Sequence, residues 1–440
     1  MHICLASIHP RALSGQIEGL AALARELERS GHKVTLVSAF GEELRRQDRL
    51  ALAERDSESL FGKLGRIGSI LAGLARQARS ADLVHINLPT PAFSILGDLL
   101  QQCLSVPVVV GFEAHLADGR RLRQSGDLWA SPQFYLPKML VNNGLLARCG
   151  WHGADRYIVS SHCQAAELLR LRFPPARVSV LPNLVDMDKL QRIDQSEARR
   201  QLGLPEGRLV GYVGHYNPVK GVDTLIRAFE YVSQHFDDCR LVLAWSGIGD
   251  PGPIERAISD TGVGHRVLHL GRAPIGALLS ALDVLALPYR LTMGQNAYPG
   301  LLLEALGVGV PLVTSDLPLL REVVEHERTA LLVPPEDAVA TATAISALLE
   351  NRDLGSRMAA EQRWLLRGPF SPPQLAKQYV QLYRHVCSGE APARTPFSAP
   401  DVVVLRASRQ IDSADEHPLV SSARPRSGPT PPSGRPGSSG

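Results

Sequence analysis

Residues 208–229 read RLVGYVGHYNPVKGVDTLIRAF, and this stretch decides the fold class of the chain. It begins with a short apolar run that a glycine closes, which is typical of a buried strand. Lys220 and Gly221 then open a helix, on whose buried face Leu225 and Phe229 recur at helical spacing. A strand that passes through a short loop into an amphipathic helix is half of a parallel βαβ unit. The stretch therefore predicts an α/β protein.

The same alternation of strand and helix runs through most of the chain. Residues 1–40 form one complete unit, in which a helix with apolar positions from Ile17 to Leu27 joins two strands. Further short apolar runs predict strands at 81–87, 106–112, 154–161, 177–183, 208–216, 239–247, 265–271, 283–289, 311–315 and 330–335. Two sets of alternating elements predict two Rossmann-like, doubly wound parallel sheets that face each other across an interdomain cleft.

Turn residues and composition divide the chain into three parts. A Pro-Asn turn in LPNLVDMDKL, residues 181–190, interrupts the periodicity, so we place an N-terminal domain at 1–185 and a C-terminal domain at 186–388. A final helix is expected at 371–387, packing back on the N-terminal domain. Residues 389–440 are rich in Pro, Ser and Gly, which predicts a disordered tail.

Composition excludes several classes of protein. The 440 residues carry 47 Lys and Arg against 44 Asp and Glu, a net charge of +3, so nothing in the overall charge favours nucleic acid. Six cysteines are scattered without metal-ligand or disulfide spacing, which favours a reducing, cytoplasmic setting. We interpret the first residues as a strand and not a signal peptide, and no apolar run is long enough for a membrane span.

Two loops that follow strands carry residues suited to an anionic ligand. Ligands of open α/β sheets bind beyond the carboxyl ends of the strands. Lys220 lies in such a loop and can reach an anion with its ammonium group, and His215 lies in the same loop. The alternative for Lys220 is a solvated surface lysine beside a turn.

The second loop lies in residues 294–311, GQNAYPGLLLEALGVGVP. Its Pro-Gly pair leaves the first backbone N–H groups of a helix exposed to an anion, and Glu304 follows one turn later, where it can accept hydrogen bonds from sugar hydroxyls. The alternative for Glu304 is a carboxylate that only complements the helix dipole. Gly15 precedes another helix and permits close backbone approach, although a single glycine is a weak signal.

Other features favour structural interpretations. Asp186-Met187-Asp188 matches an Asp-x-Asp metal-binding pattern, but such a tripeptide often arises by chance and this one lies at the expected interdomain linker. We therefore expect no bound metal. Residues 61–79 form a basic amphipathic helix, for which docking on the core with a solvated basic face is favoured over a membrane-surface role. If this helix and the basic run at 118–124 share a face, peripheral contact with an anionic membrane becomes the alternative.

Together these stretches resemble glycosyltransferase family 4, which has the GT-B fold. The resemblance spans residues 1–388 and is strongest in YVGHYNPVKGVDTLIRAF, in DVLALPY with NAYPGLLLEALGVGVPLVTSD, and in VLPNLVD. It implies a retaining, metal-independent transfer of a sugar from a nucleotide-diphosphate donor, with no cofactor. The implied donor-binding residues are Gly15, Gly214, Lys220, Arg272, Asn296, Gly300, Leu301 and Glu304.

The resemblance also gives these residues roles. Lys220 would bind the donor diphosphate, Glu304 the ribose hydroxyls, and the backbone N–H groups of Gly300 and Leu301 the phosphates. Gly271 and Arg272 would lie near the base, and Gly15 would approach the phosphates from the other domain. As the donor bond breaks, negative charge grows on the leaving phosphate, and Lys220 with the helix N-terminus would stabilise it in place of a divalent cation.

The chain departs from the family pattern at several positions. Asn296 stands where many relatives have a second glutamate, and His215 stands where many have an arginine; His215 is grouped with Lys220 and Glu304 as a catalytic candidate. Glu113 stands where relatives often have a histidine. We place the acceptor around His9, Glu113 and His115, with the identity of the acceptor open.

The expected function is transfer to a glycan, lipid-linked or other hydroxyl acceptor, in polysaccharide or glycoconjugate synthesis. The location would be the cytoplasm, or the inner face of the membrane through the basic N-terminal half. Three alternatives stay open: a small-metabolite glycosyltransferase, a non-catalytic GT-B-like binding or scaffold protein, and a nucleotide-sugar epimerase.

Overall fold

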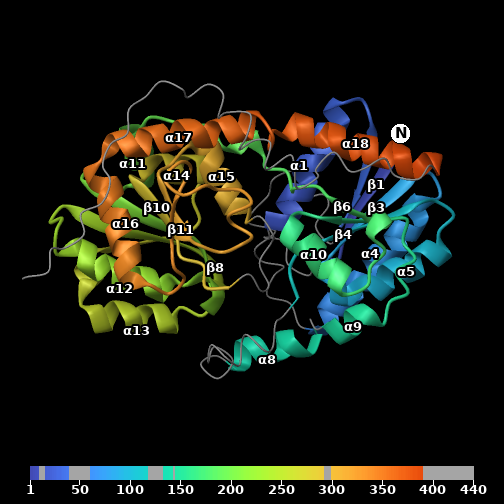
Figure 1. Cartoon of the computed structure of the whole chain (residues 1–440), viewed down its shortest axis with the longest axis horizontal. Coiled ribbons are helices and arrows are strands. Elements are labelled where there is room, and N and C mark those ends of the chain that lie inside the picture. Colours follow the sequence, from blue (N-terminus) through green and yellow to red (C-terminus); the bar gives the residue numbers. More distant parts are fainter. Residues whose placement is uncertain (9–14, 39–59, 117–131, 142–143, 292–298, 390–440) are drawn as a thin grey trace, which may run out of the picture. The chain divides into compact units, whose positions relative to one another are not determined.

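Two six-stranded parallel sheets organise the chain (Figure 1). The computed structural model describes residues 1–8, 15–38, 60–116, 132–141, 144–291 and 299–389. The strand order is β2-β1-β3-β4-β5-β6 in the first sheet and β12-β11-β10-β7-β8-β9 in the second. In both sheets the chain builds outward from a first strand in one direction and then in the other. The predicted α/β fold with two doubly wound parallel sheets is therefore confirmed.

The strands of both sheets fall within or beside the predicted apolar runs. The first sheet consists of β1 His2–Ser7, β2 Lys33–Val37, β3 Leu83–Leu88, β4 Val108–Phe112, β5 Arg156–Val159 and β6 Val178–Val180. The second consists of β7 Arg208–Tyr216, β8 Cys239–Gly249, β9 Val267–Leu270, β10 Val284–Leu287, β11 Leu312–Ser315 and β12 Leu331–Val333.

Helices connect these strands and cover the sheets. Those of the first half are α1 Gly15–Arg29, α4 Leu60–Ala78, α5 Ser94–Cys103, α8 Pro132–Val141, α9 Gly144–Arg148 and α10 His162–Arg170. Those of the second half are α11 Gln195–Leu202, α12 Val222–Ser233, α13 Gly252–Thr261, α14 Ile275–Ala281, α15 Gly300–Val308, α16 Ala338–Glu350, α17 Arg352–Arg367 and α18 Pro372–Ser388. Short 3₁₀ turns include η1 Pro91–Phe93 and η4 Pro218–Lys220.

The first sheet is buried on both faces, as a parallel sheet requires. Successive side chains of β1 alternate between two apolar clusters: Ile3 packs with residues of α1 and α18, and Cys4 packs with residues of α4 and α5. On α1 the apolar positions predicted from Ile17 to Leu27 are buried. The basic helix, α4, buries Ile70, Leu74 and Ala78 against this sheet, so the prediction that it docks on the core is confirmed.

The second sheet carries its own, larger core. Helices α12 and α16 pack together on one face, while α11, α14 and α15 form a connected layer, with α17 packed on α15 (Figure 1). Leu225, Ile226 and Phe229 of α12 are fully buried in this core. The helix predicted from the spacing in residues 208–229 is therefore confirmed, and it fixes the loop that carries Lys220.

The final helix, α18, packs against α1. The Tyr379 hydroxyl donates to the Leu181 carbonyl at 3.3 Å, and the Tyr383 hydroxyl lies 2.7 Å from Nδ1 of buried His85. The domain boundary at 185/186 stays a prediction. The predicted tail lies outside the described residues from position 390 onward, as does the basic run at 118–124.

Candidate functional site

The order of the second sheet defines where a ligand should bind. From β7 the chain moves outward to β8 and β9, and then returns through α14 to β10 on the other side of β7. The connections that leave β7 and β10 therefore diverge at the carboxyl ends of two neighbouring strands, which is the ligand-binding position of open α/β sheets. Lys220 follows β7, and Tyr289 and Glu304 follow β10.

Gly221 brings the loop after β7 against the loop after β10. Its backbone is left-handed, with φ at 65°, and a Cβ atom there would lie 2.0 Å from the Pro288 carbonyl oxygen. Only glycine accepts both conditions. The Arg290 N–H donates to the Val219 carbonyl at 3.0 Å, which ties the same two loops together. The two loops thus form one local structure around Lys220.

Lys220 rests over an aromatic ring at this junction. Its half-buried Nζ lies 4.7 Å from the centroid of Tyr289, whose side chain is buried. Burial raises the pKa of the Tyr289 phenol, and the negative charge of Glu304 raises it further, so Glu304 lies within electrostatic range of the same side chain. The structure therefore brings the two sequence-predicted residues, Lys220 and Glu304, together around a tyrosine that sequence reasoning missed.

The N-terminus of α15 comes next along the chain after the loop that leaves β10. Pro299 precedes the helix, and its carbonyl accepts hydrogen bonds from the N–H groups of Leu302 at 2.9 Å and Leu303 at 3.3 Å. The N–H groups of Gly300 and Leu301 precede the first of these bonds, so the helix itself does not use them. Together with the helix dipole they form an anion-binding end, one turn ahead of half-buried Glu304.

A second cluster lies at the carboxyl ends of β7, β8 and β9. The His215 imidazole Nδ1 lies 2.5 Å from the Ser246 hydroxyl, and the Arg272 guanidinium donates through Nε to the Ser246 carbonyl at 2.9 Å. The buried Tyr212 hydroxyl donates to the His215 carbonyl at 2.8 Å, beside Gly214. His215 and Arg272, both predicted site residues, thus meet at Ser246, which sequence reasoning did not select.

The carboxyl edge of the first sheet holds Glu113, directly after β4. This side chain is 3% exposed, and burial raises the pKa of its carboxyl group to about 8, although a hydrogen bond with Ser7 at the end of β1 opposes the rise. Glu113 is therefore mostly protonated at neutral pH. A neutral carboxyl group can both donate to and accept from a hydroxyl group.

His115 is held by the protein itself. Its Nδ1 lies 3.1 Å from Oε2 of Glu167 on α10, and the other oxygen of Glu167 accepts the Leu116 N–H at 3.1 Å. This arrangement gives His115 a structural partner. Of the remaining predicted site residues, Gly15 begins α1, whereas His9 and Asn296 lie outside the described residues.

The Asp-x-Asp pair has basic partners. Arg25 Nη2 lies 2.7 Å from Asp186, and Arg29 Nη2 lies 2.7 Å from Asp188, so α1 supplies a cation to each carboxylate. Within the described ranges, no group of three or more His, Cys, Asp or Glu side chains could hold a metal ion. The ion pairs support the structural interpretation of this motif.

Comparison with known proteins defines the family. A profile described as "Glycosyltransferase Family 4" matches residues 14–189, and one described as "Glycosyl transferases group 1" matches residues 207–351. A D-inositol 3-phosphate glycosyltransferase of Mycobacteroides abscessus is 31% identical over 253 residues, which are 55% of this chain and 54% of that protein. A phosphatidyl-myo-inositol mannosyltransferase of Mycobacterium leprae is 30% identical over 213 residues, 47% of this chain and 54% of its own.

Solved structures give the same fold. Anabaena HepE, crystallised with UDP and glucose, aligns with a TM-score of 0.65 at 20% identity, over 87% of this chain and 99% of its own. Sucrose-phosphate synthase of Thermosynechococcus elongatus aligns at 0.66 and 20% identity, over 89% and 100%. The fold is therefore GT-B, and the chain belongs to glycosyltransferase family 4. It spans about half the length of the curated relatives it matches.

Proposed function

We propose that this protein transfers a sugar from a nucleotide-diphosphate donor to a hydroxyl acceptor, with retention of configuration and without a metal. The observation that supports the proposal most strongly is the meeting of Lys220, Tyr289 and Glu304 at the point where the second sheet reverses its strand order. Structural neighbours crystallised with UDP and with UDP-glucose support a nucleotide-sugar donor.

Each donor group has a matching protein group. The diphosphate would lie between the Lys220 ammonium and the N–H groups of Gly300 and Leu301, both of which offer positive charge. Glu304 would accept hydrogen bonds from the ribose hydroxyls. The base would lie near Gly271 and Arg272, whose guanidinium is tethered at Ser246.

The same groups account for the chemistry. As the bond between the sugar and the leaving phosphate breaks, charge grows on that phosphate, and the fixed ammonium and helix N-terminus stabilise it without reorganisation. The departing phosphate oxygen takes the acceptor's proton on the same face of the sugar, which gives retention. His215 adds positive charge near the donor when it is protonated.

The acceptor would meet the edge of the first sheet at Glu113. Because this carboxyl group is neutral, it offers a hydrogen bond to an acceptor hydroxyl without a charge, as a carbohydrate or polyol requires. The names of the curated relatives refer to inositol-based molecules, one small and one lipid-linked. A glycan or lipid-linked acceptor is our first candidate, and a small metabolite is the second.

An exposed apolar face supports work at a membrane surface. Leu140 of α8 and Leu145 of α9 are each 73% exposed, and Trp151, which follows α9 in the chain, is 50% exposed. No helix within the described ranges is long and apolar enough to span a bilayer. Such residues, together with basic groups, match a surface that lies on an anionic membrane from the cytoplasmic side.

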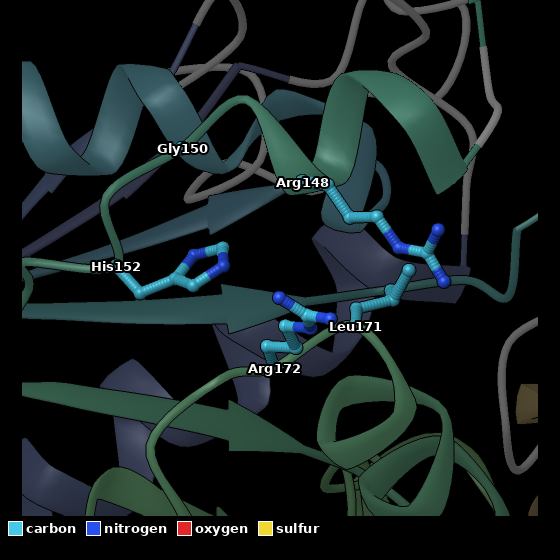
Figure 2. A pocket seen from close by; sticks show the side chains of 5 residues that line it. All are labelled: Arg148, Gly150, His152, Leu171 and Arg172. Atoms are coloured by element: carbon cyan, nitrogen blue, oxygen red, sulfur yellow. The ribbon is translucent and has the colours of Figure 1, made fainter.

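A basic pocket lies beside this face. It has a volume of about 430 Å³ and is lined by Arg148 at the end of α9, His152, and Arg172 just after α10. Figure 2 shows that Arg148 and His152 lie on one stretch of chain and Arg172 on another, around the same pocket. The phosphate of a lipid headgroup would fit this arrangement. The contact would thus use α8 and α9, and not the basic helix α4.

Vesicle binding tests the membrane proposal. Sedimentation with phosphatidylglycerol vesicles should weaken at least fivefold in Leu140→Ser with Leu145→Ser, and phosphatidylcholine alone should bind poorly. Val339→Ser is the matched control, because Val339 is 58% exposed on α16 of the other half. Equal binding by wild type and the double variant would refute the contact.

A nucleotide-sugar screen tests the enzyme proposal. Turnover with one donor, lost in Lys220→Ala and kept in Lys377→Ala, is the expected result, because Lys377 is an exposed lysine on α18. Binding without turnover would favour a scaffold protein. Interconversion of free nucleotide sugars without an acceptor would indicate an epimerase.

A further inference from the structure

A second cavity lies at the opposite end of the strands that lead to the donor site. It has a volume of about 470 Å³, and its lining includes Arg208 at the start of β7, Asp283 just before β10 and Pro311 just before β11. These are the amino ends of the strands, whereas Lys220 and Tyr289 follow their carboxyl ends. Since β7 alone has nine residues, the two sites are on the order of 25 Å apart.

The charges that line this cavity do not balance. Its carboxylate, Asp283, is already paired: it accepts from Arg199 Nη2 at 2.8 Å and from the Leu209 N–H at 2.7 Å. Arg208 is likewise paired with Asp238 at 2.5 Å. The other lining arginines are Arg192, Arg352 and Arg363, none of which has a carboxylate within salt-bridge distance in the described part of the chain.

Two of these guanidinium groups converge on one residue. Arg192 Nη1 donates to the Gly309 carbonyl at 2.9 Å, and a Cβ atom at Gly309 would lie 2.4 Å from Arg363 Nη1. Burial lowers the pKa of Arg363, and the like charges of Arg192 and Arg367 lower it further. Like charges held together in a hollow repel each other unless an anion joins them.

The remaining walls of the cavity suit an organic anion. Leu282, Pro311 and Leu348 supply apolar surface, and Arg352 at the start of α17 adds a further guanidinium group to the lining. Apolar walls with a few convergent charged groups are typical of small-molecule sites. Arginine is also the side chain best matched to phosphate oxygens.

We propose that this cavity binds a small phosphorylated molecule, with its phosphate between Arg192 and Arg363 and its carbon portion against Leu282 and Leu348. The site is separate from the donor site, and binding there does not depend on the proposed function, whereas an effector role rests on it. The two sites are linked by α15, because Gly309 caps the C-terminus of this helix and Gly300, part of the proposed donor site, begins it. The ligand is therefore placed to act as an effector.

The test uses inorganic pyrophosphate as the probe. The parent protein is the full chain with Lys220→Ala, in which the proposed donor site should bind phosphate weakly. In isothermal titration calorimetry, we expect saturable binding that weakens at least tenfold in Arg192→Gln with Arg363→Gln. Lysine at both positions should restore most of the affinity, because it restores the charge. The matched control is Arg357→Gln. Arg357 is an exposed arginine on α17, the helix that carries Arg363, and it does not line the cavity, so its replacement should change pyrophosphate affinity less than twofold.

Several results would overturn the proposal. These are no binding to the parent protein, equal weakening by the control, or unchanged affinity in the double variant. The single variant Arg192→Gln shows whether weaker binding reflects misfolding. Because the Arg192 side chain is exposed, this variant should fold normally and should still bind pyrophosphate several-fold more weakly. Binding of phosphatidylglycerol vesicles that the double variant loses, without pyrophosphate binding, would assign the arginines to lipid headgroups and not to a soluble effector. Loss of donor turnover in Lys220→Ala is a separate result, so the two proposals can fail independently.

Discussion

Replacement of Glu113 by glutamine should flatten the pH dependence of stability between about pH 5 and pH 8. Burial raises the pKa of this carboxyl group from 4.5 to about 8 in the folded protein. Between these values the folded state binds a proton that the unfolded state has released, so stability falls as pH rises. Where the difference is one full proton, each pH unit lowers the free energy of unfolding by about 1.4 kcal/mol, so the total loss between pH 5 and pH 7.5 is about 3 kcal/mol.

Glutamine has nearly the same shape as the protonated glutamate and cannot lose a proton. The variant should therefore match wild type near pH 5 and exceed it by as much as about 3 kcal/mol at pH 8. Urea unfolding at half-unit pH steps, followed by near-ultraviolet circular dichroism, measures this difference. Glu28→Gln, an exposed carboxylate on α1, is the matched control and should leave the curve unchanged. Parallel pH curves for wild type and Glu113→Gln would refute the reasoning.

Three further predictions concern the donor site. Gly221→Ala should lower the free energy of unfolding by about 1–3 kcal/mol and abolish donor binding, because residue 221 has a left-handed backbone and the new methyl group would clash with the Pro288 carbonyl. A normal melting temperature together with normal donor binding would contradict this. Tyr289→Phe should keep the donor affinity of wild type, whereas Tyr289→Leu should weaken it about fivefold, because the aromatic ring under Lys220 is lost. Equal donor affinities of the Phe and Leu variants would show that the ring does not position Lys220. EDTA should leave turnover intact; loss that manganese restores would return Asp186 and Asp188 to consideration as metal ligands.

The sequence predicted those features that depend on local pattern. Short apolar runs marked the strands of both sheets, and the spacing from Ile17 to Leu27 marked the buried face of α1. The residues that follow β7 and β10 could be chosen because ligands bind beyond strand ends, and this rule selected Lys220 and Glu304. All six cysteines are free thiols, as their scattered spacing indicated.

The features that the sequence did not show depend on long-range contacts. Tyr289 becomes a site residue only because the order of the second sheet places β10 beside β7. The partner of His115 is Glu167, 52 residues away, and no periodicity relates them. The position of Glu113 after a strand was visible, but its protonation depends on burial that the fold creates. The unbalanced arginines around Gly309 come from α17 and from a loop more than a hundred residues earlier.

The central claim is that Lys220 and Glu304 bind a nucleotide diphosphate at the carboxyl ends of β7 and β10. Titration calorimetry with UDP, and with GDP and ADP in parallel, tests it most directly on wild type, Lys220→Ala, Glu304→Ala and Lys377→Ala. We predict saturable binding of one nucleotide that weakens about 30-fold or more in each donor-site variant, since a charge-assisted bond in a desolvated site contributes about 2–4 kcal/mol. Wild-type affinity in Lys377→Ala completes the expected result. Undiminished affinity in both Lys220→Ala and Glu304→Ala, or no binding of any nucleotide by wild type, would contradict the account.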